Sequence, residues 1–150
     1  MKIVISESQY KRLIEAEEKP KILEFPSLEF FDNDPFEAWK IIQKIIQRKG
    51  NPPYSIGGNL FLYDTPIESL GNLQSVGGFL DLRRTPIESL GNLKFVGGYL
   101  DLQGTPIKSL GNLTSVGRNL YLIGTPLSKM YSGKQIRQMV NVGGKINLFK

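Results

Sequence analysis

Cysteine and histidine are both absent from this chain of 150 residues. Without cysteine there are no disulfides, no thiolate nucleophiles and no thiolate metal ligands, and without histidine there is no imidazole base. These two absences exclude most familiar hydrolase mechanisms. We therefore expect a protein that holds no metal or cofactor and is not an enzyme.

Long apolar runs are also missing. The opening MKIVISESQYKRL has only three consecutive apolar residues before Ser6 and Glu7, too few for the core of a signal peptide. No stretch approaches the length that spans a membrane. We expect a cytoplasmic protein in a reducing environment, without a membrane partner.

The composition is otherwise that of one folded domain, because 40% of the residues are hydrophobic and 22% are charged. The formal net charge of +5 comes entirely from residues 129–150, which hold five basic residues and no acidic one. A polyanion-binding surface over the whole protein is not indicated, so nucleic acid is not an expected partner. The basic end is either a solvated surface or a weak contact for an acidic partner.

Three segments of the chain repeat in register every 20 residues. They are NLFLYDTPIESLGNLQSVGG from Asn59, FLDLRRTPIESLGNLKFVGG from Phe79 and YLDLQGTPIKSLGNLTSVGR from Tyr99, and a fourth copy begins at Asn119. The x-Leu-x-Leu part of each copy has period two, so its leucines share one face of a strand. The sequence predicts five short strands, centred on Leu60/Leu62, Leu80/Leu82, Leu100/Leu102, Leu120/Leu122 and Ile146/Leu148.

One repeat cannot bury its own leucines, but stacked repeats cover one another, with parallel strands at a spacing of about 4.8 Å. Further apolar positions such as Leu73 and Val76 lie on the return path between the strands. The predicted fold class is an α/β repeat solenoid with a parallel sheet of about five short strands, an N-terminal helical cap and a helix in the last repeat.

The turns of each repeat carry two recurring pairs. The Thr-Pro pairs, the first at Thr65, mark the end of each strand, and we expect their hydroxyls to satisfy the turn backbone. The Gly-Gly pairs, such as Gly77 and Gly78, are expected to supply positive φ angles where the chain re-enters the strand. They are not a phosphate loop, because neither nucleotide-binding glycine motif is present.

The pattern L-x-L-x-x-T-P-I-x-S-L-G-N-L-x-x-V-G-G resembles a short leucine-rich repeat in which threonine takes the place of the usual ladder asparagine. The resemblance covers about residues 55–149. It implies a right-handed coil that recognises proteins on a concave sheet, generally without catalysis. The repeats are similar to those of uncharacterised bacterial and tailed-phage proteins, and the opening segment is similar to the start of small phage proteins. This resemblance implies a location in the virion or the host cytoplasm if the chain is phage-encoded.

Solenoids expose apolar surface at both ends, and a cap is predicted at each. Asp34 and Pro35 begin a strong helix, and Gly50 followed by Asn-Pro-Pro ends it. The expected division is 1–33 for an N-terminal helix and extended arm, 34–50 for the capping helix and 51–150 for the solenoid, within one structural domain. Apolar residues cover two sides of the capping helix, so the second side receives the arm or meets a partner.

Residues 6–18 form the predicted N-terminal helix, with Ser6 and Gln9 as a capping box. The segment KPKILEFPSLEFF that follows is apolar and contains two prolines, so we expect it to run extended. It is either a strap across its own protein or an interaction peptide that contacts a second copy or a particle.

A helix over residues 132–140 is predicted in the last repeat. Ser132 and Gln135 form its capping box, and Ile136, Met139 and Val140 share one face. This helix is expected to cover the end of the solenoid.

The non-leucine strand positions face outward, and six of these fifteen positions are aromatic, against 10% in the chain. Rings and arginines are typical of protein interfaces, although rings stacked along a ladder also stabilise neighbouring strands. Both interpretations stay open at this point. The candidate partner-binding residues are Phe61, Tyr63, Phe79, Asp81, Arg83, Tyr99, Asp101, Gln103 and Tyr121.

Asp81 and Asp101 occupy equivalent positions one repeat apart, so their carboxylates are expected about one strand spacing from each other. Such a pair is unfavourable unless Arg83, Lys145, a cation or a basic partner group compensates it. A catalytic carboxylate pair would need a pocket that raises one pKa, and an open sheet face provides none.

The expected function is non-enzymatic recognition of a protein partner through the aromatic outward face. The alternative is a structural or assembly component of a phage particle, anchored by its N-terminal arm. Carbohydrate binding by the same rings is a third interpretation, ranked below the other two.

Overall fold

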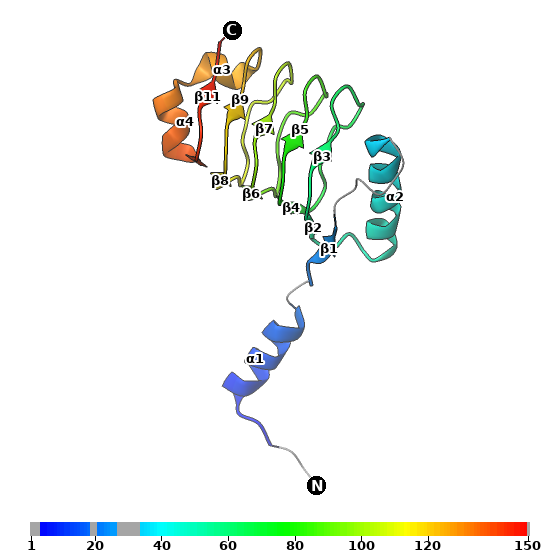
Figure 1. Cartoon of the computed structure of the whole chain (residues 1–150). Helices are drawn as coiled ribbons and strands as arrows, with labels where there is room; N and C mark the ends of the chain where they lie inside the picture. The colour runs from blue at the N-terminus through cyan, green and yellow to red at the C-terminus, as the bar shows by residue number, and fades with distance from the viewer. Residues whose placement is uncertain (1–3, 19–20, 27–33, 150) are drawn as a thin grey trace.

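The computed structural model describes residues 4–18, 21–26 and 34–149. Over these residues the chain has an α/β fold with a six-stranded and a five-stranded parallel sheet and four helices (Figure 1). None of the helices in this described part has the length and apolar character needed to cross a bilayer. From residue 54 onward, each strand of one sheet is followed along the chain by a strand of the other.

The five-stranded sheet contains the strands that the leucine pattern predicts. Neighbouring strands pair in parallel, and Leu60, Leu80, Leu100 and Leu120 are partners in successive pairs. This register confirms the 20-residue period at the level of backbone pairing. The strands are β3 (Leu60–Phe61), β5 (Leu80–Asp81), β7 (Leu100–Asp101), β9 (Leu120–Tyr121) and β11 (Ile146–Asn147), in the order β11-β9-β7-β5-β3.

The six-stranded sheet was not predicted: most of its residues were expected on a return path without strands, and those of β1 in an extended arm. In the repeats its buried residues, such as Leu73 and Val76, are three positions apart, so they show no alternation with period two. The 20-residue period nevertheless brings their backbones into register. The strands are β1 (Leu23–Phe25), β2 (Tyr54–Ile56), β4 (Leu73–Val76), β6 (Phe95–Val96), β8 (Ser115–Val116) and β10 (Asn141–Val142), in that spatial order.

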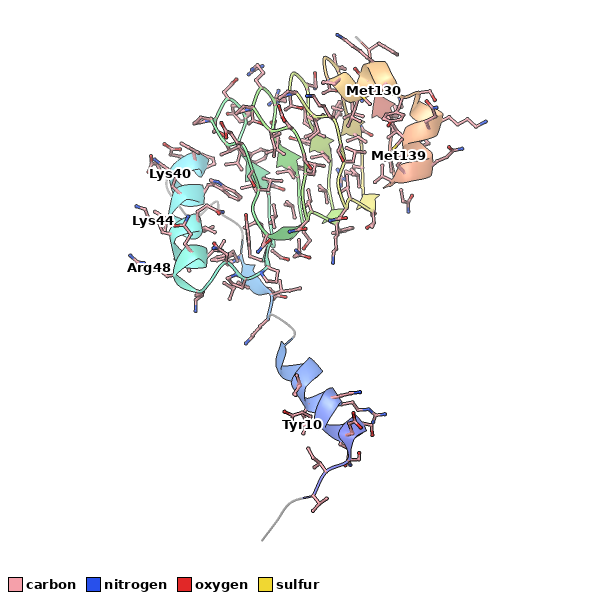
Figure 2. The ribbon with its side chains drawn as sticks, turned by 180° about the vertical axis from the view of Figure 1, so that it is seen from behind. Tyr10, Lys40, Lys44, Arg48, Met130 and Met139 are labelled. Atoms are coloured by element: carbon pink, nitrogen blue, oxygen red, sulfur yellow. The ribbon has the colours of Figure 1, made fainter. Side chains whose placement is uncertain are left out.

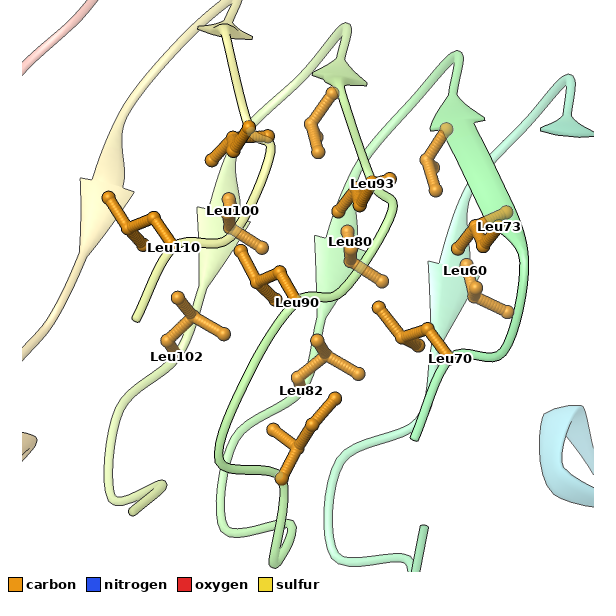
Figure 3. Packing of buried hydrophobic residues seen from close by; sticks show 14 of the residues in the cluster. Leu60, Leu70, Leu73, Leu80, Leu82, Leu90, Leu93, Leu100, Leu102 and Leu110 are labelled. Carbon is orange, nitrogen blue, oxygen red and sulfur yellow. The ribbon is translucent and has the colours of Figure 1, made fainter. Parts of the chain in front are cut away.

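The hydrophobic core lies between the two sheets. Leu60, Leu80 and Leu100 are fully buried and follow one another through it (Figure 3). Leu73 and Val76 of the second sheet are equally buried and belong to the same cluster. Each repeat thus covers the leucines of its neighbours, an arrangement compatible with a solenoid-like coil.

The threonine turns are confirmed. The hydroxyl of Thr85 donates to the carbonyl of Leu82 at 2.8 Å, and the hydroxyl of Thr105 donates to that of Leu102 at 2.7 Å. Thr65 and Thr125 make the equivalent bond. The repeated threonine therefore satisfies a carbonyl at the end of each strand, in a place where Thr85 and Thr105 are buried.

The prediction that the Gly-Gly pairs supply positive φ angles was wrong, because these glycines do not have them. A Cβ atom on Gly97 would overlap the carbonyl oxygen of Gly77, and one on Gly117 would overlap that of Gly97. The N–H of Gly97 also donates to the carbonyl of Val76 at 2.9 Å. Consecutive repeats approach so closely at this corner that only a residue without a side chain fits.

Within the repeats, positive φ angles occur instead in two other turns; Gly50 and Asn51, after α2, also have them. One turn contains Gly71, Gly91 and Gly111, with φ angles near 60°. The second directly precedes the Thr-Pro pair, and its residues are Asp64 (φ 58°), Arg84 (φ 55°), Gly104 (φ 69°) and Gly124 (φ 73°). The glycines at 104 and 124 are thus suited to a left-handed backbone, which costs less without a Cβ atom.

The predicted capping helix is confirmed as α2 (Pro35–Arg48). The side chain of Asp34 accepts hydrogen bonds from two backbone N–H groups of the first turn, and Trp39, Ile42 and Ile46 are buried against the first repeat. Lys40, Lys44 and Arg48 lie on the opposite side of α2 (Figure 2). The second apolar side is not covered by the described part of the arm, since Ile41 and Ile45 are exposed.

The N-terminal helix is α1 (Glu7–Glu18), and Ser6 and Gln9 form the predicted capping box. Figure 1 shows α1 standing apart from the sheets, and Tyr10 and Leu13 are more than half exposed. The described part of the arm is a strap, because β1 adds to the edge of the six-stranded sheet beside β2. The rest of the predicted arm, 27–33, lies outside the described residues.

The last repeat contains two helices, of which only the second was predicted. In α4 (Gly133–Met139), Ser132 and Gln135 form the capping box, and Ile136 is buried as expected. Met139 was wrongly placed on the buried face, since it lies on the outside of α4 and is 48% exposed (Figure 2). The additional helix α3 (Pro126–Met130) begins at Thr125, whose hydroxyl accepts the backbone N–H of Ser128.

Candidate functional site

The outer side of the five-stranded sheet carries five aromatic rings in or beside its strands, which we call the ring face: Phe61, Tyr63, Phe79, Tyr99 and Tyr121. Phe79 and Tyr99 stack with their centroids 4.4 Å apart and their planes 12° from parallel. Tyr121 meets Tyr99 edge to face, with centroids 6.0 Å apart. The period of 20 residues places Phe79 beside Tyr99, and Tyr121, two positions further along its own repeat, completes a cluster of three rings from three repeats.

Arg83 holds the centre of the ring face together. Its Nη2 lies 2.6 Å from Oδ2 of Asp81, and its Nε lies 3.6 Å from Oδ2 of Asp101. The guanidinium also lies over the ring of Tyr63, at 5.3 Å from the centroid. One arginine therefore compensates two carboxylates from neighbouring strands and contacts a ring of a third, as one of the sequence-based alternatives proposed.

The two aspartates occupy outward positions of the sheet, but both are buried there, so the expectation that they form part of the binding surface needs correction. Asp81 is 1% exposed and Asp101 is 7% exposed. Each lies in an inner strand between two ladder neighbours, and Arg83 binds both from outside. They anchor the surface side chains and do not offer a contact surface themselves.

The aspartates also shape the turn that follows them. Oδ1 of Asp81 accepts the backbone N–H of Arg83, and Oδ1 of Asp101 accepts the backbone N–H of Gln103, both at 3.1 Å. The side chain of Gln103 donates to the second oxygen of Asp101 at 3.1 Å. In the sequences Asp-x-Arg and Asp-x-Gln, the aspartate thus fixes the position of the outward residue two places later.

Burial sets the protonation behaviour of this cluster. It raises the pKa of the Asp101 carboxyl above its usual range, and the charge of Asp81 adds to the effect. It raises the pKa of the Tyr99 hydroxyl for the same two reasons. The hydrogen bonds to Asp81 raise the pKa of Arg83, which stays charged. Because both carboxylates are buried and hydrogen-bonded, the geometry does not favour a catalytic pair.

A groove of about 450 Å³ opens at the C-terminal end of the ring face. Rings and the residues of two glycine corners line it. The residues around the groove are Phe79, Tyr99, Gly117, Arg118, Asn119, Tyr121, Gly143 and Gly144. Three of its lining residues, Phe79, Tyr99 and Tyr121, are among those predicted from the sequence.

Arg118 and Asn119 belong to this site. Asn119 was predicted to face outward but was not chosen as a candidate, and Arg118 was missed. Arg118 is exposed, and its guanidinium lies 5.7 Å from the centroid of Phe79. Within the described residues it forms no salt bridge. The signal was present in the sequence, since the repeated Val-Gly-Gly becomes Val-Gly-Arg only at this repeat.

Asn119 links the groove to the last strand. Its amide nitrogen donates to the hydroxyl of Tyr121 at 3.0 Å, and its carbonyl oxygen accepts the backbone N–H of Lys145 at 2.9 Å. The same amide therefore orients a ring and ties two repeats together. This bond fixes the position of Tyr121 at the mouth of the groove.

Two other hollows lie away from the ring face. One, of about 590 Å³, is lined by Phe25, Phe95 and the glycine corner of the six-stranded sheet. The other, of about 630 Å³, is lined by the Glu68 and Glu88 turns. In the described ranges, no three acidic side chains gather in a way that would hold a metal ion.

No protein-family model, curated protein or solved structure matches this chain. The interpretation of the site therefore depends on the geometry of the ring face and its groove.

Proposed function

We propose that this chain is a leucine-rich-repeat-like, right-handed solenoid that recognises another protein through its ring face, without catalysis. The partner would contact Tyr63, the Phe79–Tyr99–Tyr121 cluster and Arg118. Asp81, Asp101 and Gln103 act from below by holding the surface side chains in place.

The observation that carries this proposal is the exposed Arg118, which forms no salt bridge within the described residues and lies over Phe79 beside a groove lined with rings. Aromatic and arginine side chains carry much of the binding energy in protein interfaces, because they bury large areas at a small cost in entropy. A stacked ring pair stabilises its own protein by only about 0.5–1.5 kcal/mol. Stacking between neighbouring strands thus explains the contact of Phe79 with Tyr99. It does not explain the exposed arginine that lines the same groove.

The arrangement of the rings favours a protein partner over a sugar. A sugar stacks on the free flat face of a ring. Phe79 stacks on Tyr99, and the guanidinium of Arg118 lies 5.7 Å from its centroid. Tyr99 in turn meets the edge of Tyr121. A partner that inserts a side chain into the groove needs no free ring face.

An assembly role is the second candidate, and one observation favours it. The helix α1 stands apart from the sheets, and its Tyr10 and Leu13 are 56% and 54% exposed. An apolar helix side in this position suits anchoring to a particle, including one of phage origin. Deletion of residues 1–26 would release the protein from such a particle, and an unchanged sedimentation profile would count against this role.

The main proposal is tested by affinity capture from cells that make the protein. Replacement of Tyr99 and Tyr121 by alanine should reduce recovery of the partner at least about tenfold, because it removes two of the three clustered rings. Arg118→Ala should reduce recovery without lowering the melting temperature, since Arg118 is exposed.

The matched control is Phe95→Ala. Phe95 is a ring that is 42% exposed on the opposite sheet, so its loss should leave recovery unchanged. Equal recovery by the wild-type protein, the double variant and Arg118→Ala would contradict binding through the ring face. A large loss of stability in the double variant with unchanged recovery would assign the rings to the ladder.

A further inference from the structure

The two sheets have four edge strands, which are β1 and β10 in one sheet and β3 and β11 in the other. An edge strand presents unpaired backbone N–H and C=O groups, and proteins usually cover or interrupt such edges. The four edges of this protein differ in how they are closed.

Two of the edges are covered and a third is short. At β1 the backbones of Leu23 and Phe25 bond toward β2, so Glu24 is the strand residue whose backbone points outward, and Pro26 follows it without an N–H donor. At β3 the helix α2 packs alongside (Figure 1). At β10 the guanidinium of Arg137 donates to two edge carbonyls, that of Val142 at 2.9 Å and that of Gly144 at 2.7 Å.

At the fourth edge, β11, no hydrogen bond among the described residues engages the backbone groups of Ile146 and Leu148. The N–H groups of Leu120 and Leu122 donate to the carbonyls of Lys145 and Asn147 at 2.9 and 2.8 Å. Because successive residues of a strand point their backbone groups to alternate sides, the N–H and C=O of Ile146 and Leu148 point away from β9. The described residues place no strand on that side of β11.

The side chains around β11 indicate what could bind there. Ile146 and Leu148 are half-buried, and Phe149 is 76% exposed. Lys145 is exposed, and residues 129–150 hold no acidic side chain. A second copy of the chain would bring a second basic edge to this one, and like charges on neighbouring strands repel.

We propose that the free edge of β11 binds an extended, acidic segment of another protein as an added strand. The segment would place apolar residues beside Ile146 and Leu148 and an acidic residue near Lys145. This site consists of backbone at the end of the sheet, so it is independent of the ring face.

The chain itself shows the geometry of such an added strand. Where β7 follows β5, the N–H groups of Leu80 and Leu82 donate to the carbonyls of Tyr99 and Asp101 at 3.0 and 2.9 Å. The N–H of Leu100 points the other way and donates to Asn119. A strand of sequence Tyr-Leu-Asp-Leu therefore faces its predecessor with the tyrosine and aspartate backbones only.

The test uses a fluorescent peptide with the sequence of residues 98–104, GYLDLQG, titrated with the full-length protein and followed by fluorescence anisotropy. Two N-methylated versions are compared, one methylated at the aspartate amide and one at the second leucine amide. Methylation at aspartate should weaken binding at least about tenfold, because that N–H faces β11. Methylation at leucine should leave binding unchanged, because that N–H faces solvent.

Two variants of the protein complete the test. Lys145→Glu should weaken binding of the acidic peptide several-fold and keeps the backbone intact. Leu148→Pro removes an outward N–H and should abolish binding, with Leu148→Ile as the control that retains it. If Leu148→Pro lowers the melting temperature, the methylated peptides and Lys145→Glu decide the outcome.

Three results would overturn the proposal. One is absence of binding at about 1 mM peptide. Another is equal binding of the two methylated peptides. The last is a wild-type dimer in sedimentation that Leu148→Pro dissolves, since this would assign the edge to a second copy of the chain.

Discussion

The two sheets share one core and one period but differ on their outer faces. On the six-stranded sheet the outward positions include Ser55 and Ser75, whose hydroxyls bond to each other at 2.9 Å, and Ser115 at the equivalent place. On the five-stranded sheet the outward positions hold rings, an arginine and two buried aspartates. Stacking of the repeats constrains the buried residues of both sheets alike. The outer faces are not under this constraint, so the difference between them can serve binding.

The largest effect on stability is expected at the glycine corner, where consecutive repeats touch. Gly97→Ala places a methyl group on the carbonyl of Gly77, in a corner where both backbones are held by hydrogen bonds. We expect a loss of about 3 kcal/mol or more in the free energy of unfolding, measured by urea denaturation.

The control for this variant is Gly104→Ala. Its φ of +69° makes alanine unfavourable, but the nearest atom to the new Cβ would be Cγ of the flexible Arg84 side chain at 3.3 Å, with the backbone nitrogen of Arg84 at 4.0 Å. The expected loss is about 1 kcal/mol. Equal losses in the two variants would show that close approach at the glycine corner is not what both sheets depend on.

The ring face should respond next, through Arg83. Arg83→Ala leaves the buried carboxylates of Asp81 and Asp101 without their shared cation. We expect a loss of about 2 kcal/mol in the free energy of unfolding, less than for a fully buried pair because Arg83 is 38% exposed.

The adjacent residue provides the comparison. Arg84 pairs with Asp64 on an exposed turn, where both side chains are at least half exposed. Arg84→Ala should therefore change the stability little. If it costs as much as Arg83→Ala, then burial of the aspartates is not the reason for the effect.

A smaller effect, with a defined pH dependence, is expected at Asp101. Burial raises its native pKa above the ordinary 3.8, so the ionised carboxylate lowers stability at neutral pH. This cost disappears as the pH falls through the native pKa. Asp101→Asn should thus be more stable than the wild type at pH 7, and the difference should shrink on acidification in thermal melts.

Asp64→Asn should behave in the opposite sense. The hydrogen bond from Arg84 lowers the pKa of Asp64, so its carboxylate contributes stability at neutral pH that is lost as the pH falls below 3.8. The asparagine variant should be slightly less stable than the wild type at pH 7. The same sign for both variants would contradict the assignment of burial to one aspartate and exposure to the other.

Much of the fold could be predicted from the sequence, since the 20-residue period and the leucine alternation located the five strands of one sheet. The helix caps at Asp34, Ser6 and Ser132 were equally readable, because each is a local arrangement of a few residues. The threonine turns belong to the same class. Caps, turns and periodic strands depend on residues close together in the sequence, so they can be predicted from it.

The errors concern contacts between repeats. The sequence shows that Gly77 and Gly97 recur, but only the stacking shows that their backbones touch. It shows that Asp81 alternates with leucines, but not that Arg83 binds both aspartates from outside. The six-stranded sheet was missed because its apolar residues in the repeats are three positions apart and do not alternate with period two. The departure at Arg118 was visible and was overlooked as a small break in the consensus.

The most direct test of the account is to remove one whole repeat. Deletion of residues 99–118 joins Gly98 to Asn119 and restores the Gly-Gly-Asn-Leu sequence found at Gly57 to Leu60. Deletion of residues 99–108 removes half a period and places strand residues against turn residues. We expect the first protein to unfold cooperatively in a circular dichroism melt, at a lower temperature than the wild type, and the second to show no such transition. Failure of the 20-residue deletion to fold, or equal folding of both proteins, would contradict stacking of equivalent repeats.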